Sequence, residues 1–167
     1  RAASGPDNAV LVWPAWQAGH NLGVKVVTMF PGNRSVPAVQ GVYLLFDGGN
    51  GSPQAVIDGT ELTYWKTAAD SALGADLLAR PDARTLLMVG AGALAPHLIR
   101  AYKAIRPGLQ QVRVWNRTPA KALAVAAAVT GTPAAATRDL EAAVRAADII
   151  CCATSSQEPL VHGDWLQ

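Results

Sequence analysis

The most distinctive residues are two glycines and an alanine that directly follow the apolar run at residues 86–89. Gly90, Gly92 and Ala95 have the spacing Gly-x-Gly-x-x-Ala, and the sequence after them has the character of a helix. In a turn from strand to helix, the first glycine permits a tight bend, and the second lets a pyrophosphate approach the backbone. The third small residue lets the helix pack closely on the strand, and the helix N-terminus attracts phosphate. The spacing therefore predicts a dinucleotide-binding turn, with cofactor contacts from Gly90, Ala91, Gly92, Ala93 and Leu94.

A second group of polar residues follows the next predicted strand. A helix over residues 93–105 leads through a Pro-Gly break to an alternating run at residues 112–115, which completes a β-α-β unit. In such a unit, an acidic residue after the second strand accepts a hydrogen bond from the ribose 2′-hydroxyl of NAD. This chain has no acid between residues 112 and 121. The polar residues at the end of the strand are Asn116, Arg117, Thr118 and Lys121.

These four residues suit a phosphate better than a ribose hydroxyl. A guanidinium and an ammonium are strong phosphate partners, and the threonine adds a hydroxyl. The cofactor that we predict is therefore NADPH, with NADH as the less favoured alternative. The competing interpretation is that Arg117 and Lys121 are ordinary solvated charges at the start of a helix.

The end of a later strand supplies a third group. The sequence predicts a helix over residues 119–129, a weak strand over 132–137, a helix capped by Asp139 and a buried strand over 148–153. Open α/β sheets bind ligands at the carboxyl ends of their strands. We therefore expect Thr154 and Ser155, with Ser156 beside them, to meet the ribose or the phosphates of the cofactor. An ordinary polar loop is the alternative.

The predicted fold class is α/β, with a Rossmann-type, doubly wound parallel sheet in the second half of the chain. A complete sheet of this kind has about six strands. Four strands can be found before Gln167, so we expect the domain to be incomplete in this chain.

The first half predicts a small α+β domain. A strand over residues 10–16 is expected to be ended by Pro14, and a second strand covers residues 23–30. A hairpin then pairs residues 41–46 with 54–58 across a glycine-rich loop. Lys25 stands within the apolar second strand, where a place on the solvated face is its ordinary explanation.

A helix is predicted from Thr63, as its N-cap, to residue 78. Lys66 and Thr67 would then lie in the first turn. A cation is unfavourable at a helix N-terminus unless an anion is bound there. Lys66 therefore indicates a bound carboxylate or phosphate, against the alternative of a surface lysine.

Composition limits the possible partners and compartments. The 167 residues carry a formal net charge of +2, and 16% of them are charged, so we expect no nucleic-acid partner. No run approaches the roughly eighteen apolar residues of a membrane span, and the start shows no secretory pattern. The adjacent Cys151 and Cys152 are expected to be buried, reduced thiols, which favours the cytoplasm. The three histidines stand far apart, so we expect no metal site.

Several separated motifs, taken in order, resemble the ornithine cyclodeaminase/μ-crystallin family over nearly the whole chain. They are Lys-Val-Val at 25–27, Pro-Gly-Asn at 31–33, Gln-Gly at 40–41, Asp-Gly at 58–59, Leu-Thr at 62–63, Lys-Thr-Ala-Ala-Asp-Ser-Ala at 66–72, Val-Gly-Ala-Gly-Ala at 89–93 and Ala-Thr-Ser-Ser at 153–156. Within the family, the chain is most similar to the Δ1-pyrroline-2-carboxylate reductases, which are NAD(P)H-dependent ketimine reductases. The resemblance implies a substrate-binding and dimerisation domain at residues 1–80, a truncated NAD(P)-binding Rossmann domain at residues 81–167, and a homodimer.

The resemblance also implies roles for individual residues. Lys25 matches an active-site lysine near the substrate imine, and Thr67 matches a residue that touches the cofactor phosphates. Lys66 stands where many members have an arginine that grips the substrate carboxylate, and a lysine cannot form the same bidentate contact. The family's catalytic aspartate belongs to a segment beyond Gln167.

The expected function is NADPH-dependent reduction of Δ1-pyrroline-2-carboxylate, and of Δ1-piperideine-2-carboxylate, to L-proline and L-pipecolate. Lys25 and Lys66 are the expected catalytic residues. One alternative is an ornithine cyclodeaminase, an NAD-dependent lyase that converts ornithine to proline and ammonia; the missing acid near residue 116 argues against it. The other is a non-catalytic, μ-crystallin-like protein that binds small molecules.

Overall fold

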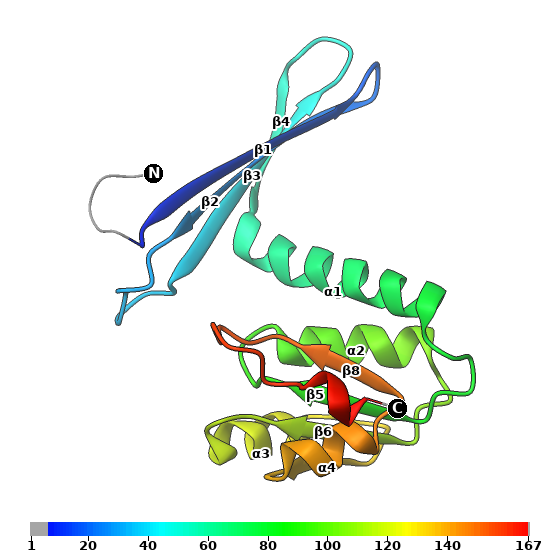
Figure 1. Ribbon diagram of the computed structural model, residues 1–167. Helices are drawn as coiled ribbons and strands as arrows, with labels where there is room; N and C mark the ends of the chain where they lie inside the picture. The colour runs from blue at the N-terminus through cyan, green and yellow to red at the C-terminus, as the bar shows by residue number, and fades with distance from the viewer. Residues whose placement is uncertain (1–6, 167) are drawn as a thin grey trace. The chain divides into compact units, whose positions relative to one another are not determined.

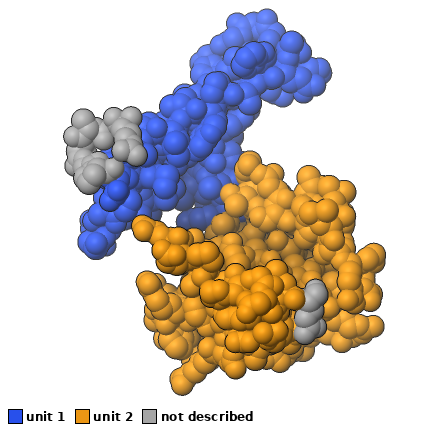
Figure 2. All heavy atoms as spheres, in the orientation of Figure 1, with its two compact units in different colours: residues 1–65 blue, residues 66–167 orange. Residues whose placement is uncertain are grey.

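The computed structural model describes residues 7–166 and divides the chain into two compact units. Unit 1 covers residues 1–65 and unit 2 covers residues 66–167, as Figure 2 shows in two colours. The boundary lies within a helix, α1 (Gly59–Leu78), whereas the sequence places the domain boundary after residue 80. We describe each unit by itself.

Unit 1 is an antiparallel sheet with the strands in chain order. The strands are β1 (Ala9–Gln17), β2 (Asn21–Met29), β3 (Val39–Asp47) and β4 (Pro53–Asp58). The predicted hairpin is β3–β4, and Asp47 Oδ1 closes its loop by accepting hydrogen bonds from the backbone N–H groups of Gly49 and Asn50 at 2.8 and 3.0 Å. Each of the expected strands is therefore present in unit 1.

The expectation that Pro14 ends the first strand is wrong. Pro14 lies inside β1, opposite Val24 of β2. β1 is an edge strand, and a proline is tolerated there because a strand with one free side does not need every backbone N–H. The sequence cannot reveal this, because edge position depends on how the strands assemble.

The expected helix start at Thr63 is also wrong. α1 begins at Gly59, because Asp58 Oδ1 accepts hydrogen bonds from the backbone N–H groups of Thr60 and Glu61 at 2.8 and 3.1 Å. Thr63 instead donates its hydroxyl to the Gly59 carbonyl. An acidic cap followed three residues later by glutamate is a known start signal, and it was present in the sequence.

Lys66 and Thr67 consequently lie about two turns inside α1, beyond the reach of its N-terminal dipole. Lys66 forms an exposed ion pair with Asp70, one helical turn away. Lys66 therefore needs no anion to offset a helix N-terminus, and the expectation of an anion bound there on that ground is wrong.

Unit 2 contains a parallel sheet with the order β7-β6-β5-β8. Figure 1 labels its strands β5, β6 and β8. In chain order its elements are β5 (Thr85–Val89), α2 (Ala95–Ile105), β6 (Gln111–Trp115), α3 (Pro119–Ala127), β7 (Ala134–Thr137), α4 (Leu140–Arg145), β8 (Ile149–Cys152) and the 3-10 turn η1 (Gly163–Trp165). Asp139 caps α4 as expected, by accepting a hydrogen bond from the Ala142 N–H at 2.9 Å. The predicted α/β class and parallel sheet are confirmed.

Helices cover both faces of this sheet. Leu86 and Met88 pack with side chains of α2 and α3 on one face, and Leu87 and Val89 pack with α4 on the other. All four of these β5 side chains are fully buried. A central parallel strand that is buried on both sides must be apolar throughout, which is why this run is so clear in the sequence.

The two cysteines have opposite environments. Cys151 is buried and Cys152 is exposed, so the expectation that both are buried is wrong for Cys152. Neighbouring residues of a strand point to opposite faces, and β8 lies at the edge of the sheet formed by the described strands. Both thiols are free. The cytoplasmic location stays a prediction.

Candidate functional site

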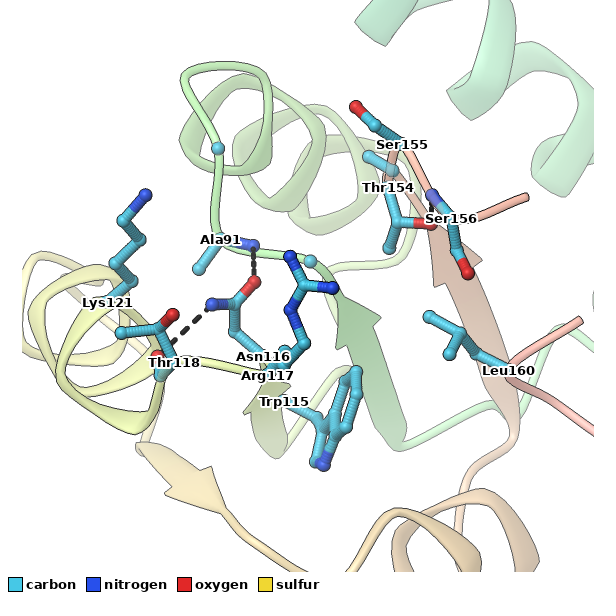
Figure 3. Close-up of a pocket in the computed structure, with 13 residues that line it drawn as sticks. Ala91, Trp115, Asn116, Arg117, Thr118, Lys121, Thr154, Ser155, Ser156 and Leu160 are labelled. Atoms are coloured by element: carbon cyan, nitrogen blue, oxygen red, sulfur yellow. Dashed lines mark hydrogen bonds between the residues drawn. The ribbon is translucent and has the colours of Figure 1, made fainter. Parts of the chain in front are cut away.

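A cavity of about 330 Å³ lies at the carboxyl ends of β5, β6 and β8 (Figure 3). Its walls are residues 90–92 after β5, residues 115–118 with Lys121 after β6, and residues 153–156 with Leu160 after β8. β6 and β8 flank β5. From β5 the chain adds β6 and β7 on one side and then crosses back to add β8 on the other, so the order of strand addition reverses beside β5. Open parallel sheets bind ligands at such a reversal.

Gly90 makes the turn that opens the cavity. Its φ is +110°, which disfavours any residue with a side chain. A Cβ on Gly90 would also lie 2.2 Å from the Ala153 carbonyl oxygen, at the end of β8. The turn therefore passes against β8 so closely that glycine is required.

Gly92 borders open space instead. A Cβ on this residue would meet no atom of the described chain within 4 Å. The backbone N–H groups of Gly92, Ala93 and Leu94 have no hydrogen-bond partner within residues 7–166, and no side chain caps α2. These donors and the positive end of the α2 dipole form the kind of cradle that receives a phosphate.

Asn116 connects the turn to the segment after β6. Its Oδ1 accepts a hydrogen bond from the Ala91 N–H at 3.2 Å, and its Nδ2 donates one to the Thr118 carbonyl at 3.1 Å (Figure 3). The Gly90 N–H donates to the Trp115 carbonyl at 2.8 Å. Two successive N–H groups of the turn are thus held by the end of β6.

Arg117 and Lys121 bring positive charge to the cavity. Both side chains are exposed, and neither has a hydrogen-bond or ion-pair partner among the described residues. Figure 3 shows Arg117 between the Ala91 turn and the segment after β8, with Lys121 on the opposite side of the turn. An anion in the cavity would meet two cations that are not engaged elsewhere.

The segment after β8 provides hydroxyl groups. Thr154 Oγ1 accepts a hydrogen bond from the Ser156 N–H at 3.3 Å, and Ser156 Oγ donates to the Glu158 carbonyl at 2.7 Å. Ser155 lies between them, exposed at the cavity edge.

The structure thus brings together most of the expected cofactor residues. Ala93 and Leu94 lie just outside the lining, in the turn before α2. Thr67 and Lys66 do not line the cavity either. Three lining residues were not expected: Trp115, Ala153 and Leu160. Leu160 has no sequence signal, because a loop carries it back to the sheet.

Lys25 lies in unit 1, in the middle of β2. It pairs with Trp13 on one side and Tyr43 on the other. Its Nζ lies 5.8 Å from the centroid of the Trp13 ring, within the range of a cation–π contact. Lys25 is half-buried.

Residues 7–166 contain neither a cluster of metal-binding side chains nor a helix able to cross a membrane. No group of three histidine, cysteine, aspartate or glutamate side chains comes close enough to hold a metal ion. Over the same range, no helix combines the length and apolar character needed to cross a bilayer.

The parallel sheet, the glycine turn and the cavity at the strand ends define an α/β protein with a Rossmann-type domain. The chain belongs to the ornithine cyclodeaminase/mu-crystallin family, whose sequence model matches residues 3–167. The resemblance noted in the sequence is therefore confirmed.

Three relatives illustrate this membership. The chain is 46% identical to a Delta(1)-pyrroline-2-carboxylate reductase of Paracoccus denitrificans, over 97% of the chain and 52% of the relative. The structure of the Thermococcus litoralis Delta(1)-pyrroline-2-carboxylate reductase, in complex with NADH and L-proline, matches with a TM-score of 0.82 and 27% identity, over 95% and 55% of the two chains. An archaeal alanine dehydrogenase dimer with bound NAD matches with a TM-score of 0.90 and 25% identity, over 98% and 51%. The chain spans about half the length of the curated relatives that it matches.

Proposed function

We propose that this chain carries the NADPH site and part of the substrate site of an enzyme that reduces cyclic ketimine carboxylates. The observation that carries the proposal is a single cavity that combines the glycine turn with two unpaired cations, Arg117 and Lys121. The named relatives, which include pyrroline-2-carboxylate reductases, support the reaction type.

The residues of the cavity fit a dinucleotide. The N–H groups at residues 92–94 would bind the pyrophosphate, because they are free and point from the start of a helix. Arg117 and Lys121 would bind a 2′-phosphate, with the Thr118 and Ser155 hydroxyls near the ribose and phosphates. Thr154 and Asn116 complete the wall. The Thermococcus relative contains NADH, so the preference for NADPH rests on the two cations of this chain.

The reaction adds a hydride to the imine carbon and a proton to the imine nitrogen, so the C=N double bond becomes a C–N single bond. The bound cofactor supplies the hydride. The proposed substrate is Δ1-pyrroline-2-carboxylate, with Δ1-piperideine-2-carboxylate as a second one, and the products are L-proline and L-pipecolate. The protein must hold the substrate, neutralise its carboxylate and support the protonated imine.

Two lysines are proposed for these tasks. Lys66 would bind the substrate carboxylate, and its exposed ion pair with Asp70 costs little to break. Lys25 would hold a proton near the imine nitrogen. Thr67 is proposed to contact the cofactor phosphates on the family resemblance alone. A homodimer is proposed as the assembly, supported by the dimeric alanine dehydrogenase relative.

The test measures NADPH and NADH oxidation by the intact protein with Δ1-pyrroline-2-carboxylate. We expect turnover with a preference for NADPH. In Arg117→Ala, the affinity for NADPH should fall about tenfold to a hundredfold while the affinity for NADH changes little, because only NADPH carries the 2′-phosphate. The control variant is Arg34→Ala, which also removes an arginine but from an exposed loop of unit 1.

Three other outcomes would contradict parts of this proposal. Ammonia release from ornithine without ketimine reduction would move the protein to the cyclodeaminase branch. NADPH binding without either reaction would indicate a binding protein. Equal affinity for both cofactors would contradict the role of Arg117 and Lys121.

A further inference from the structure

The Asn116 side chain uses its polar atoms within the protein. Its Oδ1 accepts from the Ala91 N–H at 3.2 Å, and its Nδ2 donates to the Thr118 carbonyl at 3.1 Å. A rotated amide would place NH₂ against an N–H and oxygen against a carbonyl, so these two partners fix one orientation. Asn116 therefore bridges segments that lie 25 residues apart in the chain.

This bridge extends the pairing of β5 with β6 beyond the ends of the strands. The Gly90 N–H already donates to the Trp115 backbone carbonyl, at 2.8 Å. At the next residue the Asn116 side-chain oxygen takes the place of a backbone carbonyl. The turn is thus fixed through Ala91, and the first N–H left free to meet a ligand is that of Gly92.

The same side chain also fixes the other side of the cavity. Its bond to the Thr118 carbonyl holds the backbone directly after Arg117. The glycine turn and the segment that carries the Arg117 guanidinium therefore share one side chain as an anchor.

We propose that Asn116 is a positioning residue, and not a direct ligand of the cofactor: it holds the turn of residues 90–92 in register with the segment that carries Arg117. The inference rests on the proposed NADPH site. A positioning residue of this kind affects binding of the pyrophosphate, which NADPH and NADH share. Arg117 affects binding of the 2′-phosphate, which NADH lacks.

The first test needs no cofactor. Hydrogen exchange at the Ala91 amide is measured by NMR in the intact protein and in Asn116→Ala and Asn116→Asp. The alanine variant should speed exchange at Ala91 on the order of tenfold, because the amide loses its acceptor. The aspartate variant should keep the protection, since a carboxylate also accepts. Asn33→Ala, which removes a loop asparagine that donates to the Pro37 carbonyl, is the matched control.

The second test measures dissociation constants for both cofactors. Asn116→Ala should weaken NADPH and NADH by the same factor, about tenfold, with little change in the melting temperature. Asn116→Asp keeps an acceptor for the Ala91 N–H but has no donor for the Thr118 carbonyl, so it should recover only part of the affinity for NADH. It should recover less for NADPH, because its carboxylate lies beside the site proposed for the 2′-phosphate.

Two results would overturn the inference. Unchanged exchange at Ala91 in Asn116→Ala would mean that the bond does not hold the turn. A loss of affinity in Asn116→Ala for NADPH alone would indicate that Asn116 binds the 2′-phosphate directly. If the protein bound both cofactors equally and Arg117→Ala had no effect, the proposed cofactor preference would fail instead, and the Ala91 exchange would still decide the role of Asn116.

Discussion

At the scale of single residues, the two glycines of the turn have separable roles. Gly90 is required by the fold, since its φ is +110° and a Cβ would lie 2.2 Å from the Ala153 carbonyl. Gly92 has open space where a side chain would be, so the fold does not require it. The motif therefore combines one position set by packing with one set by the ligand.

This difference predicts opposite outcomes for one added methyl group. Gly90→Ala should lower the free energy of unfolding by roughly 2 kcal/mol or more, because the backbone strain and the clash with β8 add together. Gly92→Ala should leave stability within about 1 kcal/mol of the parent but weaken NADPH binding at least about tenfold, because its methyl group fills the pyrophosphate space. Thermal unfolding and a cofactor titration measure both. Normal stability in Gly90→Ala, or normal binding in Gly92→Ala, would contradict this division.

The residues that were predicted are those whose local sequence determines their place. Gly90, Arg117 and Thr154 each lie within two residues of the end of a strand, so finding the strand places the residue at the sheet edge. Leu160 and Trp115 were missed as lining residues. Leu160 arrives through a loop, and Trp115 lies on the sheet face turned toward it, which depends on tertiary packing.

At the scale of elements, Asp148 joins two strands at their amino ends. Its Oδ2 accepts hydrogen bonds from the backbone N–H groups of Arg84 and Thr85, both at 2.9 Å. These bonds, with a smaller contribution from Arg80, lower the pKa of the Asp148 carboxyl. One carboxylate therefore fixes the start of β5 beside the start of β8.

The lowered pKa predicts how stability depends on pH. The carboxylate form is favoured in the folded state, so its contribution is present above the unfolded pKa of about 4 and is lost as the pH falls through the folded pKa. At pH 7, Asp148→Ala should lower the free energy of unfolding by about 1–2 kcal/mol. Asp148→Asn keeps an acceptor and should cost less. Denaturant unfolding between pH 7 and pH 2 should show the difference shrinking below about pH 4; a constant difference would contradict the assignment.

The sequence predicts an element most accurately where burial restricts its residues to apolar types. The strands β5 and β8 are apolar runs with no competing pattern, and both were found within one or two residues. The predicted start of α1 at Thr63 is wrong because two threonines and an aspartate are possible caps there, and the cap that forms is the local one of Asp58. The added residues, a little over one helical turn, place Lys66 about two turns from the helix N-terminus.

At the scale of the whole molecule, one face of the sheet in unit 1 carries exposed apolar side chains. Val12, Trp16 and Val56 share this face by register, and their exposed fractions are 56, 72 and 75%. An apolar surface of this kind is usually covered by another part of an assembly. The proposed homodimer is the assembly that we expect to cover it.

This expectation can be tested by light scattering on the intact protein. The parent should have the mass of a dimer, and Trp16→Glu should shift it toward the monomer, because a buried, unpaired carboxylate is costly. Glu61→Gln, an exposed change at the start of α1, is the control. A monomeric parent would contradict the proposed homodimer, and a Trp16→Glu dimer would exclude this face as its interface.

The opposite orientation of the two adjacent cysteines has a practical consequence for labelling. Burial raises the pKa of the Cys151 thiol, which keeps it protonated and inaccessible to reagents. Cys152 is exposed, so a reagent can reach its thiol, although partial burial also raises its pKa. Of these two cysteines, a maleimide dye would therefore attach at Cys152 and not at Cys151. Because Cys152 ends β8, directly before the cavity wall at Ala153, the dye would report on ligand binding from a fixed point of the sheet.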